Sequence, residues 1–351
     1  MIKDIFTKLQ DHQAYLITDS INRYYFTGLN STAGNLVITN KGQSLFIDDR
    51  YYSYAKDFLS KKVNVYKFTD EDCFFDYLKN SGITELFIDY SIFCVRDYNR
   101  LIKNGFSVLD GNSFIKSSKV IKTDIEIDYI SKACDIAYSA FVKTLSHIKT
   151  GVSEMYIKNV LEGYMRQLGA DDVSFDTIIA FGANSAVPHH ETCSDTLLEN
   201  SCILMDFGCK YKGYCSDITR TLYYGQPNDE FIKTYDVVLK ANILAEEEIF
   251  SGINGKQADK IARDYLGKNG LGQYFTHSLG HGIGLNIHED PYLSKKGEDV
   301  LLDNMVFSIE PGVYFEGKFG IRIEDTVVLK DNKVKRLFND DKKLIVLTVT
   351  K

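Results

Sequence analysis

The chain has 351 residues, of which 44% are hydrophobic and 25% are charged, and its formal net charge is −7. This length predicts two domains, and the composition is that of a globular protein able to bury a large core. The negative charge, with no long run of Lys and Arg, argues against a nucleic-acid partner, and no apolar stretch reaches the roughly 20 residues that cross a bilayer.

The N-terminal stretch and the cysteines indicate a compartment. Residues 1–11 carry several charges and lack the apolar core of a signal peptide. The seven cysteines contain no C-x-x-C pair, which favours reduced thiols that serve mainly as packing residues. Together these features predict a cytoplasmic protein with no membrane association.

The first third of the chain alternates between predicted strands and helices. Helices are expected over 50–60, over 71–80 and before Gly105, and Lys41-Gly42 marks a hairpin. Short apolar runs predict strands over 14–18, 35–39, 44–48, 63–68, 85–89 and 106–109. This order predicts a small α/β domain with a mixed sheet over residues 1–118. The polar stretch 111–122 is expected to link it to a second domain over 119–351.

The second part begins with a long predicted helix over 124–148 and a helix that Ser153 caps. Further helices are expected over 229–250 and 256–268. Extended segments are expected over 177–181, 203–207, 214–224, 305–309 and 321–329. All four prolines lie in this part, close to several histidines. Rigid backbone beside ionisable side chains is what a preorganised site requires.

An acidic hairpin is predicted around residues 210–213. This turn joins two apolar strands, and its midpoint is also the midpoint between Asp206 and Asp217. Residues equidistant from a turn face each other with side chains roughly 5 Å apart, so the two carboxylates are expected to be directly opposed. They would repel each other unless a cation or a shared proton lies between them.

A second acidic hairpin follows about a hundred residues later. Gly317 is the midpoint between Glu310 and Glu324, and the alternation of side chains places Arg322 and Glu324 on the face opposite the apolar residues. Two hairpins with two carboxylates each suggest a shared site for two divalent cations. Hard oxygen ligands with one imidazole suit manganese, cobalt or iron better than a thiolate-rich zinc site does.

Segment 276–291 holds three histidines, His277, His281 and His288, among glycines. A regular helix is unfavourable there because each glycine costs about 1 kcal/mol, so an extended and closely packed backbone is expected. The H-E-x-x-H motif of a zinc-protease helix is absent. Upstream, a glycine-bearing loop delivers His189.

Taken together, these segments resemble the proline-specific metallopeptidases, the family of aminopeptidase P and prolidase. Members share a pita-bread catalytic fold with methionine aminopeptidase. The motifs that carry the resemblance are P-H-H (188–190), M-D-F-G (205–208), S-D-I-T-R-T (216–221), H-S-L-G-H-G-I-G-L-x-I-H-E-x-P (277–291), I-E-P-G-V-Y (309–314) and I-R-I-E-D (321–325). Residues 21–28 and 47–51 are similar to the family's smaller domain, so the resemblance covers nearly the whole chain.

The resemblance implies a dinuclear metal centre in which none of the five ligand positions is substituted. The implied ligands of two divalent ions per subunit are Asp206, Asp217, His281, Glu310 and Glu324. The ion expected first is Mn²⁺, ahead of Co²⁺, Fe²⁺ and Zn²⁺. The implied catalytic residues are His189, His277, His288 and Glu310, and the implied substrate-binding residues are His189, Tyr314 and Arg322. His190 and Asp325 are expected to be structural.

The activity implied by the resemblance is that of an Xaa-Pro aminopeptidase, which releases the N-terminal residue of peptides with proline in second position. Xaa-Pro dipeptidase (prolidase) shares every ligand and is the alternative. Methionine aminopeptidase is disfavoured by the N-terminal domain and by the pair of Arg322 and Glu324. Non-enzymatic binding proteins with this fold lose metal ligands, which this chain retains. A homodimer is expected by analogy.

Overall fold

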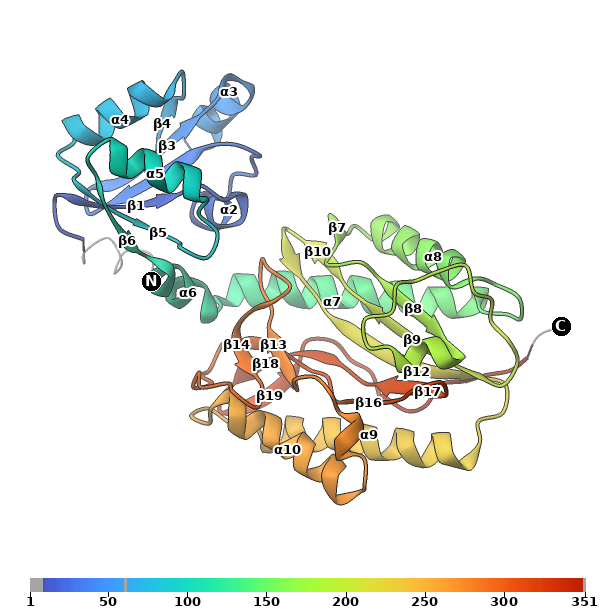
Figure 1. Cartoon of the computed structure of the whole chain (residues 1–351). Coiled ribbons are helices and arrows are strands. Elements are labelled where there is room, and N and C mark those ends of the chain that lie inside the picture. The colour runs from blue at the N-terminus through green and yellow to red at the C-terminus, as the bar shows by residue number, and fades with distance from the viewer. Residues whose placement is uncertain (1–8, 60–61, 350–351) are drawn as a thin grey trace. The chain divides into compact units, whose positions relative to one another are not determined.

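The structure is a computed structural model that describes residues 9–59 and 62–349. Two predictions fall partly outside this range: the absence of a signal peptide, which rests largely on residues 1–8, and the end of the predicted helix 50–60. The chain divides into two compact units, Met1–Lys119 and Val120–Lys351 (Figure 1). None of the described helices is long and apolar enough to span a membrane.

The N-terminal unit is built on a six-stranded mixed sheet with the order β4-β3-β2-β1-β5-β6. Its strands are β1 (Gln13–Ile17), β2 (Asn35–Thr39), β3 (Gly42–Ile47), β4 (Asn64–Lys67), β5 (Glu85–Ile88) and β6 (Ser107–Asp110). The central strands β1, β2 and β3 pair antiparallel, and the outer pairs are parallel. Alternate residues serve two cores, because Leu16 packs on one face of the sheet and Ile17 on the other. The predicted mixed sheet is confirmed.

The helices of this unit correct two predictions. They are α2 (Ser20–Thr27), α3 (Asp49–Phe58), α4 (Glu71–Asn80), α5 (Val95–Lys103) and α6 (Asn112–Val120). Helix α4 has the predicted ends, whereas α2 is absent from the prediction. The expected linker 111–122 is largely helical, as α6. Its apolar residues explain this, since Phe114 stacks on Tyr15 with ring centroids 3.7 Å apart and Ile115 is buried.

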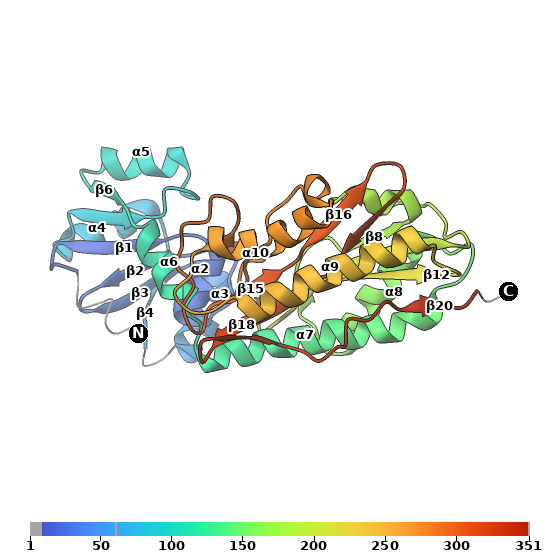
Figure 2. The same ribbon diagram turned by 90° about the horizontal axis from the view of Figure 1, so that it is seen from below.

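Four helices frame the C-terminal unit, and its strands lie between them (Figure 1). They are α7 (Asp124–Thr144), α8 (Glu154–Gln167), α9 (Asp229–Glu248) and α10 (Gly255–Lys268). Helices α7 and α8 pack together on one side, and α9 and α10 on the other. In the view of Figure 2, α9 crosses in front of the strands. The predicted helix 124–148 is thus α7 followed by a 3-10 turn, Leu145–His147.

The strands of this unit form several small sheets rather than one. The sheet with the order β20-β12-β9-β8 contains β8 (Ile178–Phe181), β9 (Ser201–Phe207), β12 (Ile218–Tyr224) and β20 (Val346–Leu347). The sheet with the order β14-β13-β15-β18-β19 contains β13 (Gly280–Gly282), β14 (Glu289–Leu293), β15 (Val306–Ile309), β18 (Asp325–Lys330) and β19 (Lys333–Arg336). The short strands are β7 (Asp172–Val173), β10 (Cys209–Tyr211), β11 (Tyr214–Cys215), β16 (Gly312–Phe315) and β17 (Phe319–Arg322).

Candidate active site

One cavity of about 690 Å³ in the C-terminal unit gathers most of the residues that the sequence singles out. The predicted metal ligands on its wall are Asp206, Asp217, His281, Glu310 and Glu324, and the other predicted site residues there are His189, His277, His288 and Arg322. Tyr314 is the predicted site residue that is not on this wall. It is buried directly behind the wall, where its hydroxyl contacts Arg322 and His277.

The first acidic hairpin has a different register from the predicted one. Strands β9 and β12 are antiparallel, but Asp206 lies opposite Thr219 rather than Asp217. The cause is the turn, which is centred on Lys212 and Gly213, one residue later than predicted, and both residues have positive φ. The partner moves by two residues, so Asp217 stays on the same face, in the irregular segment before β12.

The second acidic hairpin has the predicted register. Strands β16 and β17 pair around Gly317, and β15 and β18 continue the same pairing, with Ile309 opposite Asp325. Glu310 and Glu324 lie in register between these two ladders. A backbone hydrogen bond of 3.1 Å from Glu324 N–H to the Thr219 carbonyl joins the second hairpin to the first. This junction brings the two acidic pairs to one place.

The histidine segment is not helical, as predicted, and it is closely packed, but it is extended only in β13 and from Glu289 onwards, with bends over 284–288. His281 lies in β13, and a side chain at either flanking glycine would collide with backbone. A Cβ at Gly280 would lie 2.0 Å from the Ser308 carbonyl oxygen, and one at Gly282 would lie 2.2 Å from that of Asp290. The glycines therefore allow β13 to approach its neighbours closely enough to hold the imidazole of His281 in the cavity.

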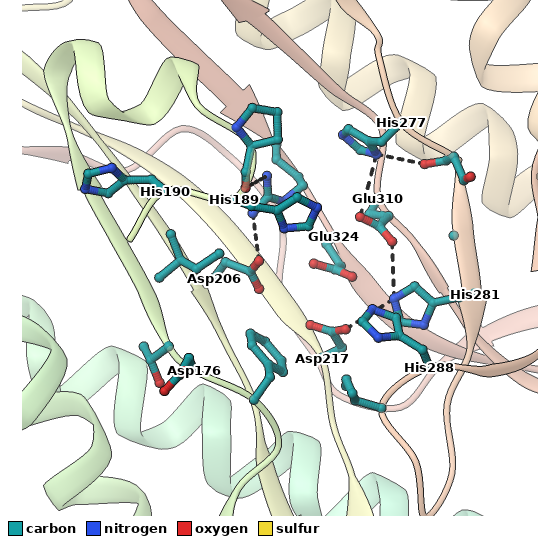
Figure 3. Close-up of a pocket in the computed structure, with 18 of the residues that line it drawn as sticks. Asp176, His189, His190, Asp206, Asp217, His277, His281, His288, Glu310 and Glu324 are labelled. Atoms are coloured by element: carbon teal, nitrogen blue, oxygen red, sulfur yellow. Dashed lines mark hydrogen bonds and ion pairs between the residues drawn. The ribbon is translucent and has the colours of Figure 1, made fainter. Parts of the chain in front are cut away.

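Three of the predicted ligands form the tightest group. Asp217, His281 and Glu324 are buried and offer ligand atoms that all lie within 4.8 Å of one another. Glu310 adjoins this group, because its Oε1 is 3.4 Å from Nε2 of His281, which is also 3.6 Å from Oδ2 of Asp217. Figure 3 shows these side chains directed towards a common space.

Asp206 approaches the group from the other side and has a cationic partner. Its Oδ2 accepts a 2.7 Å hydrogen bond from Nη2 of Arg322. Its Oδ1 is buried and has no hydrogen-bond partner among the described residues. A buried carboxylate oxygen without a partner is costly, so this atom is available for a further positively charged group.

The electrostatics of the protein atoms alone are unfavourable for this cluster. Burial, reinforced by the neighbouring carboxylates, raises the pKa of Asp217 and of Glu324 well above their usual range. Burial also raises the pKa of Glu310 to about 8. Conversely, burial lowers the pKa of His281 to about 4, so its imidazole is neutral near pH 7 and keeps a lone pair.

These properties fit a pair of divalent cations. Four carboxylates and one neutral imidazole offer mainly hard oxygen donors, and the single guanidinium of Arg322 cannot balance the charge of the acids. Bound cations would remove the repulsion that raises the carboxyl pKa values, and would give Asp206 Oδ1 a partner.

Arg322, Tyr314 and His277 form one hydrogen-bonded chain. Nη1 of Arg322 donates to the Tyr314 hydroxyl (2.7 Å), which in turn contacts Nε2 of His277 (2.8 Å). The other ring nitrogen of His277 contacts the Ser278 carbonyl oxygen at 2.8 Å, so it carries the proton, and Nε2 accepts from the Tyr314 hydroxyl. The arrangement fixes the ring of His277 with Nδ1 3.8 Å from Oε2 of Glu310.

The remaining histidines differ in their surroundings. His288 packs against His281 with ring centroids 4.3 Å apart, and burial lowers its pKa. His189 is exposed and points towards the cluster, whereas His190 points away from it (Figure 3). Nε2 of His190 instead lies 2.8 Å from Oε2 of the buried Glu154.

The structure adds two hydroxyl residues that the sequence analysis missed. Thr219 donates to Oε2 of Glu324 (2.6 Å) and accepts from Nε of Arg322 (3.1 Å), and Ser308 donates to Oε1 of Glu310 (3.1 Å). The period of two could have indicated Ser308, because it lies two residues before Glu310 on one strand face. The role of Thr219 depends on a contact between distant segments.

The contacts of Asp325 support the expectation that it is structural. Burial alone would raise its pKa, but Arg220 at 2.7 Å and Lys342 at 2.9 Å hold the pKa of this carboxyl well below its usual range. These ion pairs join Asp325, the first residue of β18, to Arg220 in β12 and to Lys342 in the C-terminal segment.

Comparisons with known proteins agree with this geometry. A model of metallopeptidase family M24 matches residues 128–331, and one of the creatinase/prolidase N-terminal domain matches residues 4–123. The Xaa-Pro dipeptidase of Pyrococcus furiosus is 36% identical over 331 residues, which cover 94% of each chain.

Two solved structures have the same fold over both units. The X-Pro aminopeptidase from Thermotoga maritima has a TM-score of 0.90 at 33% identity, covering 95% of this chain and 97% of that chain. The prolidase from Pyrococcus horikoshii has a TM-score of 0.91 at 35% identity and covers 98% of both chains. The expected fold, a mixed-sheet domain followed by a pita-bread catalytic domain, is thereby confirmed.

Proposed function

The chain belongs to metallopeptidase family M24, and from this membership we propose that it is an Xaa-Pro aminopeptidase, which releases the N-terminal residue of peptides with proline in second position. The charge of the cavity favours an aminopeptidase over a dipeptidase. A dipeptidase must hold the free C-terminal carboxylate of a short substrate near the site, and burying that charge requires a cation. An aminopeptidase substrate continues as neutral peptide.

The cations on the described cavity wall are already close to acids. Its lysine and arginine residues are Lys158 and Arg322. Arg322 is bound to Asp206, and Nζ of Lys158 lies 3.7 Å from Asp176. Glu191 adds another negative charge. This wall suits an uncharged continuing peptide better than a carboxylate.

The five predicted ligands are proposed to hold two divalent cations, with Mn²⁺ favoured by the oxygen-rich donor set: Asp206, Asp217, His281, Glu310 and Glu324. When bound, such a pair supplies an activated water near neutral pH and an electrophile for the carbonyl oxygen. The Arg322 guanidinium orients Asp206, and the Thr219 hydroxyl orients Glu324, so both carboxylates have defined directions.

The chain's own residues are proposed to manage the protons and the peptide. Glu310, held by Ser308 and lying beside His277, takes the proton of the attacking water and delivers it to the leaving proline nitrogen. Burial lowers the pKa of His288 and so favours its neutral imidazole, which can donate an N–H to the carbonyl oxygen as negative charge develops there. His189 contacts the peptide at the exposed side. Arg322 and Tyr314 position His277 and Asp206 around it.

The second candidate is an Xaa-Pro dipeptidase, which the presence of the cationic residue Lys158 on the cavity wall favours. The test compares kcat/KM for an Xaa-Pro dipeptide and the matching Xaa-Pro-Yaa tripeptide. We expect the tripeptide to be preferred, and preference for the dipeptide would overturn the proposal. Lys158→Gln provides the control: an aminopeptidase should keep its tripeptide activity, whereas a dipeptidase should lose affinity for the dipeptide.

A cytoplasmic location is proposed from the cysteine pattern, and a homodimer by analogy with relatives. Cell fractionation tests the first. Light scattering after size-exclusion chromatography tests the second, and a monomer mass across the concentration range would contradict it.

A further inference from the structure

Glu154 is a fully buried carboxylate that the proposed chemistry does not use. It is the first residue of α8, and its exposed fraction is 0%. Its Oε1 accepts hydrogen bonds from the Phe181 N–H (2.8 Å) and from Nδ2 of Asn184 (2.9 Å). Its Oε2 accepts from the Cys193 N–H (3.1 Å) and from Nε2 of His190 (2.8 Å). This number of hydrogen bonds to one buried carboxylate indicates that Glu154 holds particular segments of the chain in place.

These donors lie at both ends of loop 182–192. Phe181 is the last residue of β8, and at Cys193 the chain returns to the start of α8. There the Met155 N–H donates to the Cys193 carbonyl (3.0 Å), and the Glu154 N–H donates to that of Asp195 (3.0 Å). One carboxylate therefore ties the beginning of the loop to its end. The positive end of the α8 dipole favours its negative charge.

The loop carries His189 to the cavity. Among the described residues, the imidazole of His189 has no hydrogen-bond partner, and it is exposed. Its place is therefore set by the loop backbone rather than by its own contacts. Arg322 also contacts the loop from the cavity side, because its Nη1 donates a long hydrogen bond of 3.4 Å to the Pro188 carbonyl.

We propose that Glu154 is a positioning residue that holds the two ends of loop 182–192 together, so that His189 faces the bound peptide. Glu154 does not touch the substrate and acts through His189. The inference rests on the proposed function only in assigning a peptide contact to His189. The joining of the loop ends by Glu154 is a property of the chain without substrate.

Glu154, His190 and Cys193 also have the composition of an ion-binding group. Hydrogen bonding explains their geometry better. Nε2 of His190 lies 2.8 Å from Oε2 of Glu154, whereas two ligands of one tetrahedral zinc ion would lie about 3.3 Å apart. The Cys193 thiol also donates to this Oε2 (3.3 Å), so a hydrogen bond accounts for the third member of the group as well.

The first test is a double-mutant cycle on an Xaa-Pro-Yaa substrate. Glu154→Gln keeps the shape but turns an amide group towards N–H donors, so kcat/KM should fall about a hundredfold as His189 shifts. In a His189→Ala background the same change should lower kcat/KM by less than about threefold. A full additional loss in that background would overturn the proposal.

Glu126→Gln is the matched control. Glu126 is also a buried glutamate in the first turn of a helix, α7, and it accepts from the Tyr214 hydroxyl at 2.9 Å, away from the cavity wall. Its kcat/KM should stay within about twofold of the parent value. Equal losses in the two variants would mean that only general stability is affected, against the proposal.

The second test needs no catalysis. In the absence of substrate, the amides of loop 182–192 should exchange hydrogen at least about tenfold faster in Glu154→Gln than in the parent, while those of α9 are unchanged. Asn184→Ala, which removes one donor and leaves the carboxylate intact, is the milder variant if Glu154→Gln does not fold. Unchanged protection of the loop would overturn the proposal.

Activity and hydrogen exchange test the proposed function and the role of Glu154 separately. Absence of activity on every Xaa-Pro peptide would refute the proposed function, while hydrogen exchange would still decide the role of Glu154. Metal analysis of Cys193→Ala decides between hydrogen bonding and an ion. Equal metal content supports the proposal, and loss of one equivalent would overturn it.

Discussion

Removing one hydroxyl, with Thr219→Val, tests whether the protein holds Glu324 and Arg322 in fixed directions. Thr219 is fully buried, and its Oγ1 is the only group on this side chain that can bond to both. Valine has nearly the same shape and leaves both charged partners without that bond. Thr221→Val is the matched control, because Thr221 is buried in the same strand and bonds only the backbone of Arg322.

The expected losses of unfolding free energy depend on whether the lost hydrogen-bond partners are charged or neutral. A hydrogen bond to a charged group contributes about 1.5–3 kcal/mol, so Thr219→Val should lower the unfolding free energy by about 3 kcal/mol, since Arg322 keeps its bonds to Asp206 and Tyr314. Thr221→Val loses two neutral bonds and should cost about 2 kcal/mol. The two variants should therefore be similar in stability but different at the site.

Metal affinity and activity separate them. Loss of an orienting group beside a ligand typically weakens metal binding by about 10- to 100-fold, so Thr219→Val should require correspondingly more Mn²⁺ for half-maximal activity. Thr221→Val should match the parent. Urea unfolding measures stability, and titration of the chelated protein with Mn²⁺ measures affinity. Equal metal affinity in the two variants would refute the reasoning that Thr219 orients Glu324.

Exhaustive chelation should abolish hydrolysis of an Xaa-Pro substrate and Mn²⁺ should restore it, whereas activity that survives chelation would contradict the metal site. Asp217→Asn should abolish turnover without lowering the melting temperature of the metal-free protein, because it removes a carboxylate that burial and its neighbours destabilise; near-parent rates would contradict its role. Burial lowers the pKa of His277 to about 3, so the unfolded chain, with a value of about 6.5, binds more protons between these pH values. Unfolding free energy should therefore fall as the pH drops through this window, by at most about 1.4 kcal/mol per pH unit from this residue, and less steeply in His277→Gln; identical pH profiles would exclude the shift.

The sequence predicted more of the site than of its surroundings. Period-two alternation selected the strand face for Asp206, Arg322 and Glu324, and Gly317 set the correct register of the second hairpin. The first hairpin was misjudged because Lys212 and Gly213 form the turn. The error changed the residue opposite Asp206 by two positions. A shift of two residues keeps every side chain on the same face of the strand, so the acidic cluster was still predicted.

Helical segments outside the site were harder to predict. Helix α2 has only eight residues, too few to show a clear period, and the polar composition of α6 concealed the packing of Phe114 on Tyr15. The two helices also contact each other across a long stretch of sequence, since Phe26 of α2 stacks on Phe114 of α6. Local propensity is a weak guide where such contacts supply most of the stability.

By itself the sequence determined which donor atoms the chain offers and on which face of each strand they lie, because side-chain direction follows from backbone period. Only the tertiary structure decided which distant groups meet: Thr219 between Glu324 and Arg322, His277 against Tyr314, and Glu154 across the ends of its loop. These contacts join segments that are far apart along the chain, and their geometry depends on turn positions and packing that no local pattern encodes.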